Sequence, residues 1–352
     1  MLLRAGAAPA RLFAMSKATR IEGRGYSLTV LESPEGPLEF ARSVADRLRR
    51  DPRWLDYKYL YDAAGSEIFD RITEQPEYYL TRTERSILAE RAGEIRRAAG
   101  STTLVELGSG SSDKTRLLLE AWTAAGPTRY VPVDISRTAL ESACAGLASS
   151  FPDLAIDGIA GSFEDALPRI AGHSPQTLLF LGSSIGNMNV VERAAFFAAA
   201  SRSLSPGDSL VLGLDLVKDP VRLEAAYDDE AGWSALFTKN LFVRMNRELG
   251  TAIPIDAIEH VAYYNDRRER IEIYAEFGRA VTIDLLGSGR SFRIAPRERL
   301  RTEISRKFRV DRMSRELAKH GFERVRCDLD PEADFAVLTL RRVLQAGPAL
   351  PT

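Results

Sequence analysis

The sequence predicts an α/β protein built on a doubly wound parallel sheet that ends in an antiparallel hairpin, with a second, smaller α+β lobe beside it. Between residues 102 and 219, four short apolar runs alternate with helix-like segments. Near the C-terminus, one helix-like segment precedes two strand-like runs. Strands that are apolar throughout are typical of parallel sheets buried on both faces, which favours this architecture.

The first apolar run, TTLVEL (102–107), is closed by GSGSSDK and followed by TRLLLEAW with helical spacing, which predicts a strand, a tight loop and a helix. Three further strands are predicted in RYVPVDIS (129–136), TLLFLGSSIGNM (177–188) and SLVLGLDLVKD (209–219). The segment 191–204, VERAAFFAAASRSL, is typical of a helix between the last two. Residues 313–343 predict a helix and a hairpin that turns at DPEAD.

The interior stretch 220–307 has another texture, with a long helical portion at 223–249 and strand-like RIEIYAEF, AVTIDLL and SFRIA. With the segment 22–98 it is expected to form the second lobe. The sheet domain then covers 99–219 and returns at 308–352. Residues 1–21 contain no acid and resemble a transit peptide superficially, but a disordered tail outside the fold is the favoured interpretation.

Composition narrows the function classes. The chain has 352 residues, of which 45% are hydrophobic and 28% charged, as in an ordinary globular protein of roughly two domains. Lys plus Arg (48) nearly cancels Asp plus Glu (49), so neither nucleic acid nor an anionic membrane is an expected partner. Two cysteines and three histidines lie too far apart for a metal site, and no run is long enough to span a membrane. A cytoplasmic protein without a metal is therefore expected.

The loop after the first strand favours a nucleotide-like ligand. Gly108 and Gly110 allow the backbone to turn sharply and approach a ligand closely. Asp113 stands where a dinucleotide fingerprint needs its third glycine, which disfavours NAD and FAD. Asp134 closes the next strand, where its carboxylate is expected to bind a ribose diol; the alternative is an acid at a helix N-terminus. Glu106 is either a ligand-side acid or a strand-end charge. Together with the terminal hairpin, these features fit S-adenosylmethionine better than a nicotinamide.

Two further segments carry candidate ligand groups. YDAAGSEIFDRITEQPEYYLTRTE (61–84) is rich in tyrosine, although tyrosines such as Tyr61 and Tyr78 are commonly core residues. LGSSIGNM (181–188) presents the Gly182 backbone and the Asn187 amide at the sheet edge where ligands bind. An amide can donate to a carboxylate and accept from an amine, which suits an amino acid.

Eight segments in order strongly resemble the L-histidine Nα-methyltransferase family of ergothioneine biosynthesis, which is S-adenosylmethionine-dependent. The resemblance covers about residues 36–343. It rests on YDAAGSEIFDRITEQPEYYLTRTE, VELGSGSSDKT, YVPVDIS, FLGSSIGNM, LVLGLDLVKD, AAYDDEAG, NRELG and RTEISRKF. It implies a class I methyltransferase-like sheet domain with a substrate lobe, and trimethylation of the α-amine of L-histidine to hercynine without a metal.

The resemblance also implies roles for individual residues. Tyr61 and Asn187 are the catalytic candidates, with Tyr61 near the substrate amine. S-adenosylmethionine contacts are implied for Gly108, Lys114, Asp134, Ser162 and Phe163. Substrate contacts are implied for Tyr61, Tyr78, Gly182, Asn187, Tyr227, Ile273, Glu303 and Ser305, of which Glu303 and Ser305 match the pair that recognises the imidazole ring.

Several positions depart from the family pattern. Ser162 replaces an Asp that contacts the adenine amine, and Ile273 replaces a Met of the substrate pocket. Trp233 and Thr238 also deviate. Two alternatives therefore stay open: an Nα-methyltransferase of another amino acid such as tryptophan, and a non-catalytic module that binds S-adenosylmethionine or a nucleotide. A monomer is expected, because a two-lobed enzyme with an internal crevice needs no partner to complete its site.

Overall fold

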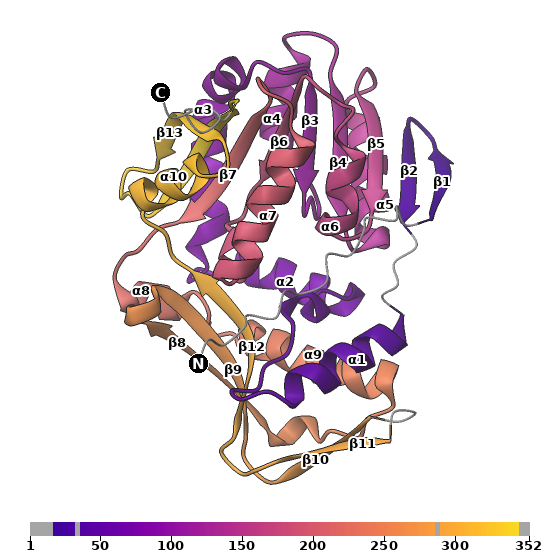
Figure 1. The fold of residues 1–352 in the computed structure, drawn as a ribbon, viewed down its shortest axis with the longest axis vertical. Helices are drawn as coiled ribbons and strands as arrows, with labels where there is room; N and C mark the ends of the chain where they lie inside the picture. The colour runs from indigo at the N-terminus through magenta and orange to yellow at the C-terminus, as the bar shows by residue number, and fades with distance from the viewer. Residues whose placement is uncertain (1–16, 32–35, 286–288, 345–352) are drawn as a thin grey trace, which may run out of the picture.

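A nine-stranded sheet forms the larger part of the molecule in the computed structural model, which describes residues 17–31, 36–285 and 289–344 (Figure 1). Across the sheet the strands run in the order β1-β2-β5-β4-β3-β6-β7-β14-β13. The predicted doubly wound sheet and its terminal antiparallel hairpin are confirmed. The strands are β3 (Thr103–Leu107), β4 (Arg129–Asp134), β5 (Ala155–Ala160), β6 (Gln176–Phe180), β7 (Ser209–Asp215), β13 (Phe322–Leu329) and β14 (Phe335–Arg342), with β1 and β2 described below.

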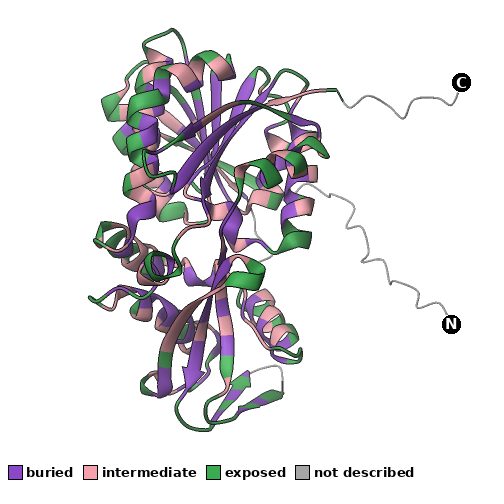
Figure 2. Cartoon of the chain, turned by 90° about the vertical axis from the view of Figure 1, so that its left-hand side faces the viewer, coloured by how far each residue is buried: buried purple, intermediate pink, exposed green. Residues whose placement is uncertain are grey.

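Helices cover both faces of this sheet, so its central strands are buried along their whole length (Figure 2). One face packs against α3 (Tyr79–Ala99), α4 (Thr115–Thr123) and α5 (Arg137–Ser150). The other face packs against α6 (Phe163–Ala166), α7 (Val190–Ser203) and α10 (Val310–Ala318). Successive residues of a strand point to opposite faces, and both faces are covered, which explains why the central strands consist mainly of apolar residues.

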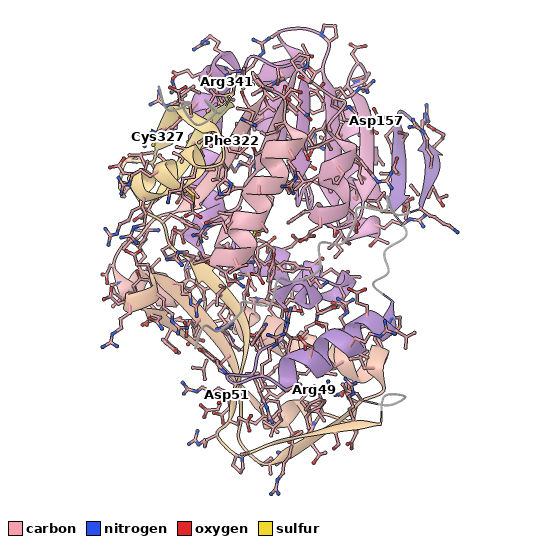
Figure 3. The ribbon with its side chains drawn as sticks, in the orientation of Figure 1. Arg49, Asp51, Asp157, Phe322, Cys327 and Arg341 are labelled. Atoms are coloured by element: carbon pink, nitrogen blue, oxygen red, sulfur yellow. The ribbon has the colours of Figure 1, made fainter. Side chains whose placement is uncertain are left out.

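An N-terminal hairpin extends the sheet at one edge. The strands β1 (Ala18–Gly23) and β2 (Tyr26–Leu31) pair antiparallel, and β2 runs parallel to β5. The hydroxyl of Ser27 donates to Asp157 Oδ1 at 2.8 Å, and Figure 3 labels Asp157 on this edge. The sequence-based boundaries placed 18–21 in a tail and 22–31 in the second lobe, and they are wrong here. Because the partner strand lies about 130 residues away, local patterns carry no sign of the pairing. The rest of the predicted tail, 1–16, lies outside the described residues.

The second lobe lies below the carboxyl edge of the sheet in Figure 1. It combines a three-stranded antiparallel sheet, a separate hairpin and four helices. The elements are α1 (Pro37–Leu48), α2 (Ala63–Glu74), α8 (Pro220–Ala225), α9 (Trp233–Leu249), β8 (Ile258–Asn265), β9 (Arg270–Phe277), β10 (Val281–Leu285), β11 (Arg290–Ile294) and β12 (Arg299–Arg306). Although α3 was predicted within this lobe, it packs against the main sheet, since its buried face meets α4, β13 and β14.

The chain leaves the main sheet after β7 and returns to the same place after β12. The Phe308 amide donates to the Asp215 carbonyl at 2.8 Å, and the Val217 amide donates to the Phe308 carbonyl at 3.1 Å. These bonds hold the end of β12 against the carboxyl end of β7. No helix within the described ranges is long and apolar enough to cross a membrane.

Candidate active site

The glycine loop after β3 is held against the end of β4. Gly108 and Gly110 have φ angles of +71° and +49°, a region that L side chains rarely adopt. The Asp134 carboxylate accepts from the Gly110 amide at 2.9 Å and from the Ser136 amide at 2.8 Å. Burial raises the pKa of Asp134, and these amide donors oppose the shift. Asp134, the predicted ribose acid, therefore joins the glycine loop to the end of β4. One of its oxygens accepts from the loop, and the other accepts from the residue two positions after Asp134.

The ring of Phe163 lies beside this loop, and we call the loop and this ring together the cradle. A Cβ on Gly108 would lie 3.4 Å from the Phe163 ring, at van der Waals contact, so the glycine leaves the backbone uncovered on the side of the ring. The Phe163 ring packs edge-on against Phe180 at 5.4 Å between centroids. Ser162 caps α6: its hydroxyl donates to Asp165 Oδ2 at 2.9 Å and accepts from the Asp165 amide at 3.2 Å. The O–H of Ser162 is thus already donated to Asp165, and its oxygen caps the helix.

Glu106 belongs to the support of the loop. It is buried and accepts from Thr115 Oγ1 at 2.6 Å and from the Tyr130 hydroxyl. Burial raises its pKa to about 7. Because Glu106 is bound to these two hydroxyls, the structure favours the interpretation that it is a charge at the end of the strand and not an acid that contacts the ligand.

Lys114 follows the glycine loop, and its ammonium lies close to Gly182 of the segment after β6. Its ammonium pairs with Glu84, a fully buried residue of α3. The same carboxylate accepts from the Gly182 amide, with N–O distances of 2.8 and 2.9 Å. A contact between the Gly182 backbone and the substrate was predicted. Because the Gly182 N–H donates to Glu84, the Gly182 carbonyl is the backbone group left for this contact.

A cavity between the sheet edge and the second lobe is lined by all eight predicted substrate-binding residues. Gly182 and Asn187 come from the segment after β6, Tyr61 and Tyr78 from the ends of the α2 region, and Tyr227 from the turn after α8. Ile273 of β9 lies opposite Glu303 of β12 in the strand register. Glu303 and Ser305 are two residues apart in β12, so their side chains lie on the same face of that strand. Their individual roles remain predictions, but one cavity holds them all.

One end of this cavity is polar. Asn187 Nδ2 donates to Glu303 Oε1 at 3.1 Å, so the amide oxygen of Asn187 and its second N–H remain for a ligand. Burial raises the pKa of Glu303 to about 7, against the opposing effects of Lys307 and of the Asn187 bond. The hydroxyls of Ser305 and Tyr227 lie 2.7 Å apart beside it. A carboxylate and a hydroxyl pair thus face the cavity side by side.

The opposite wall is aromatic. Phe69 contacts both Tyr61 and Tyr78 edge-on, with centroid distances of 5.5 and 6.1 Å. Phe237 packs against Tyr61 at 5.2 Å, and Tyr78 packs against Tyr227 at 6.1 Å. Burial holds the pKa of Tyr61, Tyr78 and Tyr227 well above the usual tyrosine value, so their hydroxyls stay protonated at neutral pH. Such a ring cage can surround a cationic amine.

Several lining residues were missed from the sequence. His260 Nε2 lies 2.8 Å from the Tyr227 carbonyl, so this nitrogen carries the proton and Nδ1 accepts from Thr238 Oγ1 at 2.8 Å. Burial lowers the pKa of His260, which keeps the ring neutral. Thr238 had been noted only as a departure, and no local signal marked His260. The other missed residues are Phe69, Ile72, Ser183, Ser184, Ala226, Ser234 and Phe237.

Fold and glycine loop define a class I S-adenosylmethionine-dependent methyltransferase. A family model described as "Histidine-specific methyltransferase, SAM-dependent" matches residues 40–342. The chain is 43% identical to the histidine N-alpha-methyltransferase of Mycolicibacterium smegmatis, over 84% of this chain and 95% of the relative. It is 40% identical to that of Mycobacterium tuberculosis, over 86% and 94%. A 4-dimethylallyltryptophan N-methyltransferase of Epichloe festucae var. lolii is 29% identical over 58% and 64%. The chain belongs to the family of histidine-specific, S-adenosylmethionine-dependent methyltransferases.

Within the described ranges, no three His, Cys, Asp or Glu side chains come together as a metal site would require. Of the predicted donor-binding residues, Gly108, Asp134, Ser162 and Phe163 gather around the glycine loop, whereas Lys114 turns toward Glu84. The open cradle at Gly108 and the carboxylate at the strand end fit an adenosine group.

Proposed function

We propose that this enzyme transfers three methyl groups from S-adenosylmethionine to the α-amino nitrogen of L-histidine. The product is the trimethylated betaine hercynine, and the reaction is the first step of ergothioneine biosynthesis. Glu303 and Ser305 carry this proposal, because they place a carboxylate and a hydroxyl on one strand face at the polar end of the cavity. A neutral imidazole has one N–H donor and one acceptor nitrogen, which these two groups can satisfy together.

S-adenosylmethionine supplies an electrophilic methyl group on a sulfonium. In each transfer the lone pair of the amine nitrogen forms the new C–N bond while the C–S bond breaks, and S-adenosylhomocysteine leaves. The nitrogen must be unprotonated before each attack, so each round also releases one proton to water. Histidine thus consumes three donor molecules and ends as a quaternary ammonium.

The side chains of the cavity act mainly by positioning the amine. Two bound molecules held at attack distance can gain up to roughly 7–11 kcal/mol in favourable cases. Asn187 offers its amide oxygen to the amine, because this oxygen is the acceptor of its side chain and one N–H of Nδ2 is bound to Glu303. Tyr61 is not a base, because burial raises its pKa; its role is to hold the amine, or a water that takes the proton, through its hydroxyl oxygen.

The aromatic wall accounts for trimethylation. Each methyl group adds bulk, and the final product carries a permanent positive charge. The rings of Tyr61, Tyr78, Phe69 and Phe237 can stabilise such a cation without competing as acceptors for an N–H.

A product assay tests the proposal. The purified enzyme is incubated with S-adenosylmethionine and L-histidine, and mass spectrometry resolves products with one, two and three methyl groups. Accumulation of trimethylhistidine is the expected result. An enzyme that gives no methylated histidine, or that methylates tryptophan equally well, contradicts it. Tryptophan is disfavoured on physical grounds, because an indole has no acceptor nitrogen for the hydroxyl pair.

The proposal also includes that the enzyme acts on a small molecule, as a monomer and in the cytoplasm. Both cysteines support a reducing compartment: Cys144 and Cys327 carry free thiols.

A further inference from the structure

A lysine that the reaction does not use lies directly behind the polar end of the cavity. Lys307 follows β12, and its side chain is completely buried. Its ammonium lies 2.7 Å from Asp215 Oδ2, 2.8 Å from Tyr227 Oη and 2.9 Å from Ser305 Oγ. An ammonium has three N–H donors and no acceptor, so these three oxygen atoms use all of its hydrogens.

This arrangement dictates the hydrogen-bond polarity of the two hydroxyls. Both Ser305 and Tyr227 accept from Lys307, and one of them must donate to the other across 2.7 Å. A phenol is the more acidic hydroxyl, so the favoured direction is from Tyr227 to Ser305. The Ser305 oxygen then accepts twice, which saturates its lone pairs. Its own O–H is left to donate into the cavity.

The charges near the polar end of the cavity also favour a ligand group with an unprotonated nitrogen facing Ser305, which means a neutral ring. Among the described residues, the titratable or charged groups that face it besides Lys307 are Tyr61, Tyr78, Asp215, Lys218, Tyr227, His260 and Glu303. The tyrosines and His260 are neutral, as described above. Asp215 pairs with both Lys218 and Lys307, and Glu303 supplies the second carboxylate that balances these two ammoniums once it is ionised, above its pKa of about 7. A neutral ring preserves this balance, whereas an imidazolium would leave an uncompensated positive charge in a buried site, which is costly.

We propose that Lys307 makes the site select the neutral imidazole ring of its substrate. By saturating Ser305 as an acceptor and placing a positive charge behind it, Lys307 directs an unprotonated ring nitrogen toward Ser305 and the ring N–H toward Glu303. Lys307 is thus a specificity-determining positioning residue. This inference rests on the proposed function, since it assumes that Glu303 and Ser305 receive the ring.

Nitrogen NMR of bound substrate tests this assignment directly. L-Histidine labelled with ¹⁵N in the ring is bound to saturation in the presence of S-adenosylhomocysteine, and the ring signals are followed from pH 5 to 8. The chemical shifts distinguish protonated from unprotonated ring nitrogens. The test variant is Lys307→Met. Lys218→Met is the matched control, because the Lys218 ammonium also binds Asp215, but its other hydrogen bond goes to the Tyr79 hydroxyl and not to Ser305 or Tyr227.

In the wild-type enzyme and in Lys218→Met, one protonated and one unprotonated nitrogen are expected at pH 6, with a bound-ring pKa below the ordinary value of about 6.5. In Lys307→Met the bound-ring pKa is expected to rise by about one unit or more, so that both nitrogens are protonated at pH 6. An imidazolium bound to the wild-type enzyme at pH 6 overturns the proposal, as does an unchanged bound-ring pKa in Lys307→Met.

Two controls keep these outcomes interpretable. Asp215 retains Tyr79 and Lys218 as partners when Lys307 is replaced, which supports folding of the variant. If Lys307→Met does not fold, as judged by S-adenosylhomocysteine binding, Lys307→Gln takes its place, and the wild-type ring state is decisive by itself. A wild-type enzyme that makes trimethylhistidine but binds the imidazolium refutes only the role of Lys307. One that neither binds nor methylates histidine refutes the proposed function.

Discussion

Replacing Glu303 by glutamine should weaken histidine binding strongly without disturbing the fold. In the wild-type protein, one carboxylate oxygen accepts from Asn187 Nδ2 at 3.1 Å, which leaves the other for the ring N–H. In Glu303→Gln a single amide oxygen replaces two acceptors, so an NH₂ group faces either Asn187 or the ring. Loss of a charge-assisted hydrogen bond and the resulting unpaired donor together cost about 2–3 kcal/mol, or an affinity roughly 30- to 150-fold lower.

Isothermal titration calorimetry with L-histidine and saturating S-adenosylhomocysteine measures this effect. The titration is done at pH 8, where Glu303 is ionised because its pKa is about 7. Glu323→Gln is the matched control, since Glu323 is an exposed residue of β13 far from the cavity. A Glu303→Gln affinity within threefold of the wild-type value would refute the idea that this carboxylate holds the ring.

The remaining predictions concern stability and the donor site. Because burial raises the pKa of Glu303 from 4.5 to about 7, its ionisation opposes folding above pH 7. Glu303→Gln should therefore raise the melting temperature of the ligand-free enzyme at pH 8, by a gain that shrinks as the pH falls toward 4.5; an equal gain at all pH values would contradict this. Asp134→Asn should lower S-adenosylhomocysteine affinity roughly 10- to 100-fold in calorimetry, and an unchanged affinity would show that Asp134 does not bind the ribose. Gly108→Ala should cost about 1–2 kcal/mol of stability and also weaken donor binding. Gly207→Ala, at φ +96° with open space around it, should cost stability alone, so equal donor binding in both variants would exclude the cradle.

Local patterns in the sequence predicted the centre of the fold well. The strands β3, β4, β6 and β7 consist mainly of apolar residues, because both faces of the sheet are covered. Such apolar runs can be recognised in the sequence without knowing which strand pairs with which. The hairpin β13–β14 was found through its two strand-like runs and the DPEAD turn between them, although β13 is an edge strand with many exposed residues. In contrast, β1 and β2 are recognisable only once β5 lies beside them.

The second lobe was predicted less completely. Three of its strands were found, but β8 and β12 were not named as strands. Most residues of β8 are half-buried and form no clear apolar run, and in β12 apolar and polar residues alternate with arginines. The alternation in β12 reflects the cavity: Glu303 and Ser305 face it. Only the resemblance to a known family, and no local pattern, pointed to these two residues.

The same limit applies to the candidate site. The sequence placed Gly108 and Asp134 together, because the order of strand, loop and strand is local. It could not show that Glu84 occupies the Gly182 amide, nor that His260 holds Tyr227 from behind. Those contacts join elements that are from 33 to 98 residues apart and form only in the folded chain.

A crystal structure of the enzyme with S-adenosylhomocysteine and L-histidine tests the central claim most directly. The expected complex has the adenosine group beside Gly108 and Asp134, with one ring nitrogen of histidine hydrogen-bonded to Glu303 and the other to Ser305. The α-amino nitrogen should point toward the sulfur of the donor product. Histidine bound outside this cavity, or with its ring beyond hydrogen-bond distance of both Glu303 and Ser305, would contradict the claim.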